Sequence, residues 1–445
     1  MSGGQPRPLL GMAAGLAVLL ALGACGGNTT TVESTTARTT TTPSAAQAGA
    51  QASAGTGGGA GVVGSPGSAS TNVPGVDASG ASTVSSDGTT IAGQPTSTLV
   101  RPFAASSPWN TPVETFPTDP RSATYMRLVQ QRVGIIENGN VLRTFPRQIT
   151  AGLFINTRKW TTPVVDEQGG QPTGVVCRQL QSPEICGDGL NLRSLLIPPN
   201  VSPLPQYDGW FTVLNRREGV AYDMWRARRG ANGGLISYQF MRKWSLLGPG
   251  YQKPNTVSAR GSGLPLFAGL ILPEEIQAGR IEHALAISLP GPAARRYVQP
   301  ASASDGIGNL NSLPEGARIR LKPGATFGRL PGRTSRRAAQ AILLALRRYG
   351  AILVDRSAVP TLYAKLNYNW ANPLRDANGR LLDANGRALT GRLARRADQG
   401  TPLLRGNEAQ GLHMSDFEVV QLPTILNFPP LNSTPAASTF TPVIP

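Results

Sequence analysis

Cysteine and histidine are scarce in this chain of 445 residues, which contains three cysteines and two histidines. So few thiol and imidazole groups exclude a zinc ribbon, a cysteine-rich scaffold and a metal site built from several histidines. Glycine and proline are frequent, but they follow no Gly-X-Y period, so a collagen helix is excluded as well. We therefore expect neither a metal site nor an organic cofactor.

Acidic residues and lysine are also few. The chain has 25 acidic and 42 basic residues, a net charge of +17, and nearly all of the basic residues are arginine. A surface of this charge attracts anionic polymers, although an arginine bias also follows from a GC-rich genome. Nucleic acid is not an expected partner, because the chain carries an export signal and no recognised nucleic-acid-binding motif.

The longest apolar run, residues 9–22, is too short to span a membrane comfortably. It follows Arg7 and ends in Leu22-Gly23-Ala24-Cys25, a secretory pattern that resembles the lipobox of bacterial lipoproteins. We predict a signal peptide over residues 1–25, lipidation of Cys25, and a position on the extracytoplasmic side of the cell membrane, held by the lipid anchor alone. A cleaved signal beside a chance cysteine is the alternative.

Residues 26–98 are mostly threonine, serine, alanine and glycine, and they hold too little apolar surface to offset the entropy of folding. We interpret them as a disordered tether, residues 99–432 as a single β-rich domain, and residues 433–445 as a flexible tail. Cys177 and Cys186 are the other two cysteines. In an oxidising compartment they are expected to form a disulfide, with a free pair as the alternative.

Short segments with strand periodicity dominate the folded part. Helical patterns are fewer, and the clearest runs from the capping residue Ser335 to Tyr349 before Gly350. The expected strands cover 210–214, 220–227, 281–289, 317–321 and 351–355, and the other expected helices cover 120–132 and 273–278. Many short strands with Pro/Gly turns predict a mainly β fold with helical insertions, built as an antiparallel, jelly-roll-like β-sandwich.

Several short sequence motifs, each present once, follow one another over residues 105–420. They include YDMWRAR at 222–228, SARGSGLP at 258–265, GRIEHAL at 279–285, LPEGAR at 313–318 and DFEVV at 416–420. On these motifs the chain resembles a family of secreted and lipid-anchored proteins of actinobacteria and other soil bacteria that is uncharacterised, so the resemblance implies no activity. Similar sequences often have Asp-Gly-His where this chain has Asp208-Gly209-Trp210, and any role of that histidine is lost here.

Asp223 lies on the second strand of the expected hairpin, after Tyr222 and on the same face as Trp225. An aromatic ring offers a platform to a sugar, and a carboxylate beside it binds hydroxyl groups or acts as an acid or base. Asp223 is therefore a candidate catalytic residue, and Tyr222 and Trp225 are candidate substrate-binding residues. A strand-edge aspartate paired with an arginine is the alternative.

His283 and Glu274 are two further candidate catalytic residues, because a histidine base needs a carboxylate partner. A hydrogen-bonded histidine in the core is the more common role for such a residue. Arg260 and Ser262 in a glycine-rich loop, and Asp355 at the end of a short strand, are candidate substrate-binding residues. The loop lacks the Lys-Ser/Thr of a phosphate loop, and a structural turn is the alternative.

These features favour a cell-envelope lipoprotein that binds or cleaves carbohydrate, with an acidic polysaccharide as the first choice. A glycoside hydrolase needs two carboxyl groups about 5–10 Å apart, whereas a polysaccharide lyase needs a cation and a base. The alternative is a non-enzymatic lipoprotein that adheres to anionic cell-wall polymers or has a structural role. The enzyme hypothesis predicts that Asp223, Arg260 and His283 meet in one cleft, and the adhesion hypothesis predicts that they are scattered.

Overall fold

A computed structural model describes residues 101–133, 152–179, 186–330, 334–395 and 400–429. Strands make up 27% and helices 13% of this part, so the expected mainly β fold is confirmed. The signal, lipidation, tether and tail predictions fall outside the described residues. None of the helices in the described ranges is long and apolar enough to cross a membrane.

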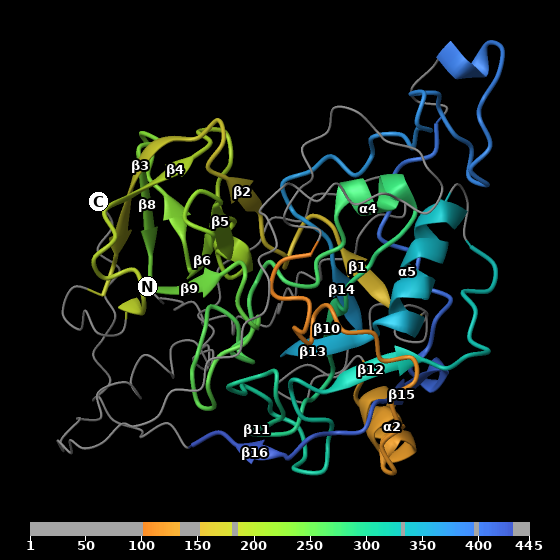
Figure 1. The fold of residues 1–445 in the computed structure, drawn as a ribbon, viewed down its shortest axis with the longest axis horizontal. Helices are drawn as coiled ribbons and strands as arrows, with labels where there is room; N and C mark the ends of the chain where they lie inside the picture. Colours follow the sequence, from red (N-terminus) through yellow and green to blue (C-terminus); the bar gives the residue numbers. More distant parts are fainter. Residues whose placement is uncertain (1–100, 134–151, 180–185, 331–333, 396–399, 430–445) are drawn as a thin grey trace, which may run out of the picture.

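The larger lobe is built on a six-stranded mixed sheet with the order β1-β14-β10-β13-β12-β15 (Figure 1). These strands span Phe154–Asn156 (β1), Thr361–Tyr363 (β14), Leu285–Leu289 (β10), Ala351–Arg356 (β13), Arg318–Leu321 (β12) and Phe417–Val419 (β15). The central strands alternate between two buried faces. Leu285, Ile287 and Leu353 belong to one hydrophobic cluster, and Ala286 and Ile352 belong to another.

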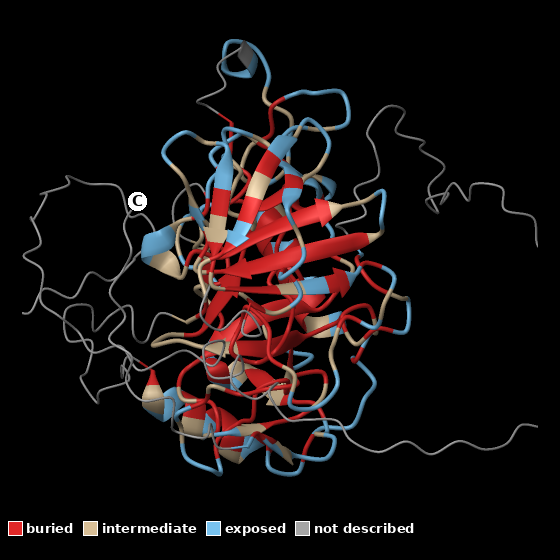
Figure 2. Cartoon of the chain, turned by 90° about the vertical axis from the view of Figure 1, so that its left-hand side faces the viewer, coloured by how far each residue is buried: buried red, intermediate tan, exposed pale blue. Residues whose placement is uncertain are grey.

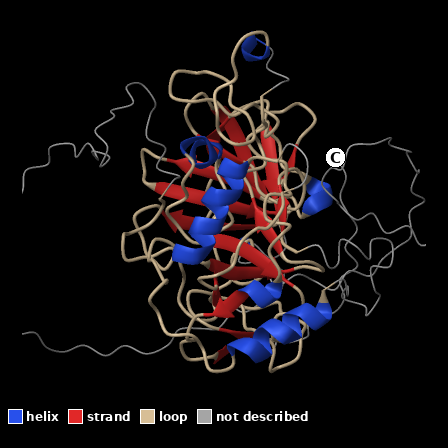
Figure 3. Cartoon of the chain, turned by 90° about the vertical axis from the view of Figure 1, so that its right-hand side faces the viewer, coloured by secondary structure: helices blue, strands red, loops and turns tan. Residues whose placement is uncertain are grey.

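Helices cover the first of these faces. The amphipathic helix α5 (Arg336–Arg348) lies over the strands (Figure 3) and buries Ile342 and Leu346 against Leu285 and Leu353. The Ser335 side chain accepts a hydrogen bond from the amide of Ala338 at 3.1 Å, which confirms the predicted cap. Helices α2 (Ser122–Arg132) and α4 (Pro273–Ala278) contribute apolar side chains to the same cluster.

The smaller lobe, residues 164–245, is a pair of four-stranded sheets that we call the sandwich lobe (Figure 1). One sheet contains β2 (Val164–Asp166), β5 (Phe211–Asn215), β6 (Val220–Trp225) and β9 (Phe240–Ser245), and the other contains β4 (Ser194–Ile197), β3 (Gln171–Cys177), β8 (Leu235–Tyr238) and β7 (Arg228–Arg229). The two-stranded sheet of β11 (Arg296–Tyr297) and β16 (Leu426–Asn427) completes the fold. The β5–β6 hairpin confirms the expected antiparallel pair.

The second hydrophobic cluster joins the two lobes. It contains Trp210 and Trp225 from the sandwich lobe together with Ala286, Ile352 and Tyr363 from the six-stranded sheet. Buried residues of both lobes therefore belong to one hydrophobic core. Figure 2 shows in red that the central strands are largely buried. This junction is where the candidate site lies.

The pairing of the strands differs from the antiparallel sandwich that the sequence predicts. β1 pairs with β14, β10 with β13, β2 with β5 and β3 with β8 in parallel. Parallel neighbours need long crossover connections, which leave no local turn signal in the sequence. The strand expected at 281–289 also starts only at Leu285, because residues 280–284 form a loop after α4.

Cys177 and Cys186 form the expected disulfide. Both half-cystines lie in the core of the sandwich lobe, next to Phe211 and Met241. Replacing both by serine is expected to lower the free energy of unfolding by about 2–3 kcal/mol, because the bridge closes a short loop in the unfolded chain. Urea unfolding of the oxidised native chain and the double variant measures this difference. Equal midpoints would contradict it.

Candidate active site

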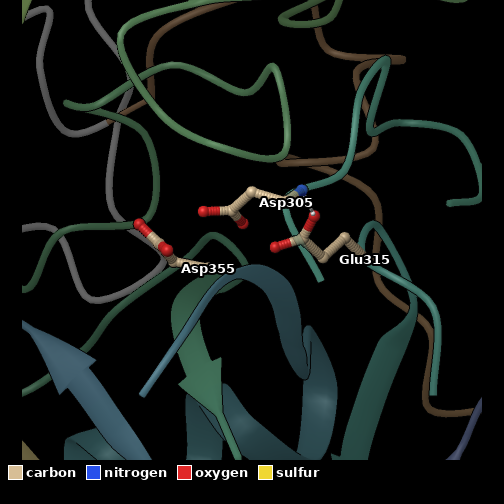
Figure 4. Close-up of side chains that lie close together, drawn as sticks. All are labelled: Asp305, Glu315 and Asp355. Atoms are coloured by element: carbon tan, nitrogen blue, oxygen red, sulfur yellow. Dashed lines mark hydrogen bonds between the residues drawn. The ribbon is translucent and has the colours of Figure 1, made fainter. Parts of the chain in front are cut away.

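Three acidic side chains meet near the junction of the lobes. Asp305, Glu315 and Asp355 each contribute a carboxylate oxygen, and these oxygens all lie within 4.8 Å of one another (Figure 4). Glu315 is fully buried, whereas Asp305 and Asp355 are partly accessible. We call these three residues the carboxylate cluster.

A β-bulge in β13 turns Asp355 toward this cluster. Ile287 of β10 is opposite Leu353, but the next residue, Ser288, is opposite Asp355 rather than Val354. Because cross-strand partners share a face, the extra residue moves Asp355 from the helix-covered face of Leu353 to the face of Ser288. Without the bulge the Asp355 carboxyl group would point into the hydrophobic cluster that α5 covers.

The other two acids come from the long connection between β11 and β12. The amide of Asp305 donates to the Glu315 carboxylate at 3.1 Å, which ties the two residues together. The amide of Gly316 donates to the carbonyl oxygen of Leu353 at 2.8 Å and anchors Glu315 beside β13. Backbone hydrogen bonds thus hold a loop acid and a strand acid in one place.

Burial and mutual repulsion change the protonation of the cluster. Burial, followed by the negative charge of Asp305, raises the pKa of Asp355 to about 8. Burial and the charges of Asp305 and Asp355 also raise the pKa of Glu315 well above its usual value. Oδ1 of Asp305 and Oε1 of Glu315 are buried and have no hydrogen-bond partner in the described part of the chain, an arrangement that a proton held within the cluster would satisfy.

Two guanidinium groups offset the charge of the cluster. Nε of Arg356 lies 3.1 Å from Oδ2 of Asp305, and the positive charge of Arg260 acts on Asp355. Three oxygen ligands at this spacing also suit a hard divalent cation such as Ca²⁺. The two arginines already supply positive charge, however, and this favours protons over a metal ion at the cluster.

Arg260 lies at the centre of the lobe junction. Its guanidinium carbon is 5.1 Å from the ring centre of Trp210 and 5.0 Å from that of Tyr363, and 1% of the residue is exposed. Its charge also acts on Asp223, whose carboxylate accepts hydrogen bonds from Thr212 Oγ1 at 2.6 Å and Leu266 N at 2.7 Å. Burial raises the pKa of Asp223 to about 6 despite these contacts.

Gly261 leaves the space that Asp305 occupies. A Cβ atom at this position would lie 2.3 Å from the Asp305 carboxyl group. Gly261→Ala is therefore expected to displace Asp305 and to lower any activity of the cluster at least tenfold, since small misplacements of reacting groups are costly. Gly234→Ala, where a Cβ would meet nothing within 4 Å, is the matched control. Equal activity in the two variants would show that the position of Asp305 does not matter.

The sequence-based candidates divide into two groups. The charge of Arg260 acts on both Asp223 and Asp355, but Asp223 and Arg260 are buried side chains and do not line a cleft in the described part of the chain. Ser262 is buried in the adjoining loop, and its hydroxyl has no hydrogen-bond partner in the described part of the chain. Glu274 is exposed on α4, with no contact to the carboxylate cluster among the described residues.

His283 does not join Asp223 and Arg260. Its Nε2 lies 2.8 Å from Oε1 of Glu275, and both side chains are buried. Burial lowers the pKa of His283, but the charge and hydrogen bond of Glu275 outweigh this and leave it raised. The predicted meeting of Asp223, Arg260 and His283 in one cleft is therefore wrong for the histidine, which forms a buried ion pair with a neighbour of Glu274.

The aromatic platform expected beside Asp223 does not form. Tyr222 is 4% and Trp225 2% exposed. The two rings lie on opposite faces of β6, where each is packed in a different hydrophobic core. Neither ring can present a face to a sugar in this arrangement. The residues that sequence reasoning missed are Asp305, Glu315 and Arg356. The sequence marks Asp305 and Glu315 only weakly, by a Ser-Asp-Gly turn and a Pro-Glu-Gly turn in a segment without periodicity.

Comparison with known proteins found no matching protein-family model, no similar curated protein and no similar solved structure. The geometry of the site therefore carries the functional argument.

Proposed function

We propose that this protein is a cell-envelope glycoside hydrolase whose reaction takes place at the carboxylate cluster. The observation that carries the proposal is the pairing of Asp355, whose raised pKa of about 8 keeps it protonated at neutral pH, with Asp305, whose negative charge is stabilised by Arg356. Carboxyl groups in different protonation states are what glycosidic cleavage needs.

In the proposed reaction, Asp355 protonates the glycosidic oxygen as the bond to the anomeric carbon breaks. Asp305 attacks that carbon, and water then releases the sugar while the Asp355 carboxylate takes back a proton. The spacing within 4.8 Å is nearer to the about 5–5.5 Å of retaining enzymes than to the about 6.5–9.5 Å of inverting enzymes. The Glu315 carboxylate holds Asp305 in place by accepting a hydrogen bond from the Asp305 amide. Arg260 offsets the negative charge around Asp355.

The proposal includes a place for the reaction. The signal-like segment 9–22 and Cys25 support export and a lipid anchor, and the long polar segment that follows supports a site held away from the membrane. A polysaccharide outside the membrane is then the partner, and no nucleic acid is involved. The rival proposal is a lipoprotein that binds wall polymers without cleaving them.

The test is turnover by the full chain on neutral and acidic polysaccharides, with new reducing ends and the ultraviolet absorbance of unsaturated sugars as readouts. Reducing ends without this absorbance are expected, and Asp305→Asn should abolish them. Both signals together would indicate a lyase instead. Binding without turnover, unchanged in Asp305→Asn, would support the adhesion hypothesis.

A further inference from the structure

Three arginines gather at one edge of the sandwich lobe. Arg178 follows β3 and donates from Nη1 to the Ser237 hydroxyl at 2.8 Å and from Nη2 to the carbonyl oxygen of Arg226 at 2.5 Å. Arg228, the first residue of β7, is paired with the same Ser237 across the sheet. We call Arg178, Arg226 and Arg228 the arginine cluster.

Two of the positive charges in this cluster are partly buried, and the charge of Asp208 offsets part of that of Arg226. Burial, with the charges of Arg228 and Arg226, lowers the pKa of Arg178 to about 10. Burial also lowers the pKa of Arg226, with Asp208 opposing this and Arg228 adding to it. Among the described residues none of the three forms an ion pair. Partly buried guanidinium groups this close together attract an anion.

Asp208 lies close to one member of the arginine cluster and to one member of the carboxylate cluster. The amide of Arg226 donates to the carbonyl oxygen of Asp208 at 2.9 Å, and the charge of Asp208 acts on both Arg226 and Asp355. Two residues later, Trp210 packs against Arg260. Asp208 therefore acts on one residue of each cluster, and a ligand that extends past Asp208 can contact both.

The backbone at this connection is strained. Arg226 has a φ of 50° and Asp208 a φ of 61°, and their backbones are joined by a hydrogen bond. Left-handed conformations cost free energy for residues with a side chain, and they persist where the surroundings hold a functional group in position. Here they hold the chain between the two clusters.

We propose that the arginine cluster is an anion subsite, and that it binds the carboxylate of a uronic acid unit next to the sugar at the carboxylate cluster. The substrate class is then a carboxylated polysaccharide. This inference rests on the proposed function, because it uses the same ligand. Arg178 contacts the Ser237 side chain and Arg228 is its partner across the sheet, and guanidinium groups offer paired donors to a carboxylate.

The test uses the full chain carrying Asp355→Asn, so that cleavage does not disturb the measurement, and titrates oligogalacturonate by calorimetry. Adding Arg178→Gln and Arg228→Gln is expected to weaken binding at least tenfold. The matched control replaces Arg280 and Arg336, two exposed arginines near α4 and α5, by glutamine, and is expected to change binding less than twofold. Arg228→Gln alone is the second variant, because Arg228 is exposed and its loss does not disturb the fold.

Each outcome bears on the subsite. Equal loss in the test and control variants would overturn it, because general charge attraction would then explain the binding. Tighter binding of a glycerol-phosphate polymer or of a sulfated oligosaccharide than of oligogalacturonate would overturn the uronate class. Selective loss of oligogalacturonate binding supports the subsite even if native protein cleaves no polysaccharide, so failure of the proposed hydrolysis is recognised separately.

Discussion

Replacing Asp355 by asparagine is expected to reduce the rate of glycoside cleavage by about 100-fold or more, because the amide cannot donate the proton that the leaving oxygen needs. In the native protein the rate is expected to fall as the pH rises above about 8, where Asp355 loses its proton. Initial rates of reducing-end formation between pH 5 and 9 measure both effects.

The same substitution is expected to stabilise the protein at alkaline pH. The pKa of Asp355 is raised from 3.8 to about 8, so between these values the folded state binds more protons than the unfolded state. Its stability therefore falls as the pH rises, by about 1 kcal/mol per pH unit. Asparagine removes this dependence, and urea unfolding at pH 5 and pH 8 should show a variant that gains on the native protein at the higher pH.

Loss of activity together with a gain in stability distinguishes a catalytic acid from a structural one. Glu218→Gln, in the exposed turn of the β5–β6 hairpin, removes one carboxylate elsewhere and should change neither quantity. If Asp355→Asn kept full activity while Glu274→Gln lost it, the sequence-based assignment would be right and the carboxylate cluster would not be the site.

The second large effect is expected at His283. His283→Ala leaves the Glu275 carboxylate buried without its partner, which is expected to lower the free energy of unfolding by about 3–5 kcal/mol. The rate per folded molecule should stay unchanged, because among the described residues neither His283 nor Glu275 contacts the carboxylate cluster. Urea unfolding and titration of active sites on the soluble fraction separate the two quantities.

The pH dependence of the pair gives an independent check. The folded-state pKa of His283 is raised, so its contribution to stability is fully present below its unfolded pKa of 6.5 and is lost as the pH rises through the folded value. The double variant His283→Leu, Glu275→Leu should lose this dependence and be more stable than His283→Ala. A His283→Ala protein with native stability but no activity would restore the histidine as a catalyst.

Local signals explain which elements the sequence predicts well. The β5–β6 hairpin has alternating apolar positions around one turn, and α5 has a serine cap and an apolar stripe. Helix α4, predicted at 273–278, has those bounds because proline starts it and Gly279 ends it in a left-handed conformation. The disulfide is predicted because Cys177 and Cys186 are the two cysteines outside the N-terminal segment. All of these depend on residues that are close in the chain.

The candidate site depends on residues that are far apart. Asp305 and Glu315 lie in a loop without periodicity, and contacts with residues of β13, the hydrogen bond from Gly316 to Leu353 and the ion pair of Asp305 with Arg356, bring them there. The bulge that turns Asp355 toward them results from pairing with β10, some 65 residues earlier in the chain.

The sequence by itself determined that the protein is basic, that an apolar segment precedes a long polar one, and that short strands dominate its folded part. Only the tertiary structure decided that the strands pair in mixed sheets, that His283 is joined to Glu275, and that three carboxyl groups share one site. The reason is that composition and periodicity report local preferences, whereas burial and charge repulsion, which set the chemistry of Asp355, arise only when distant segments pack together.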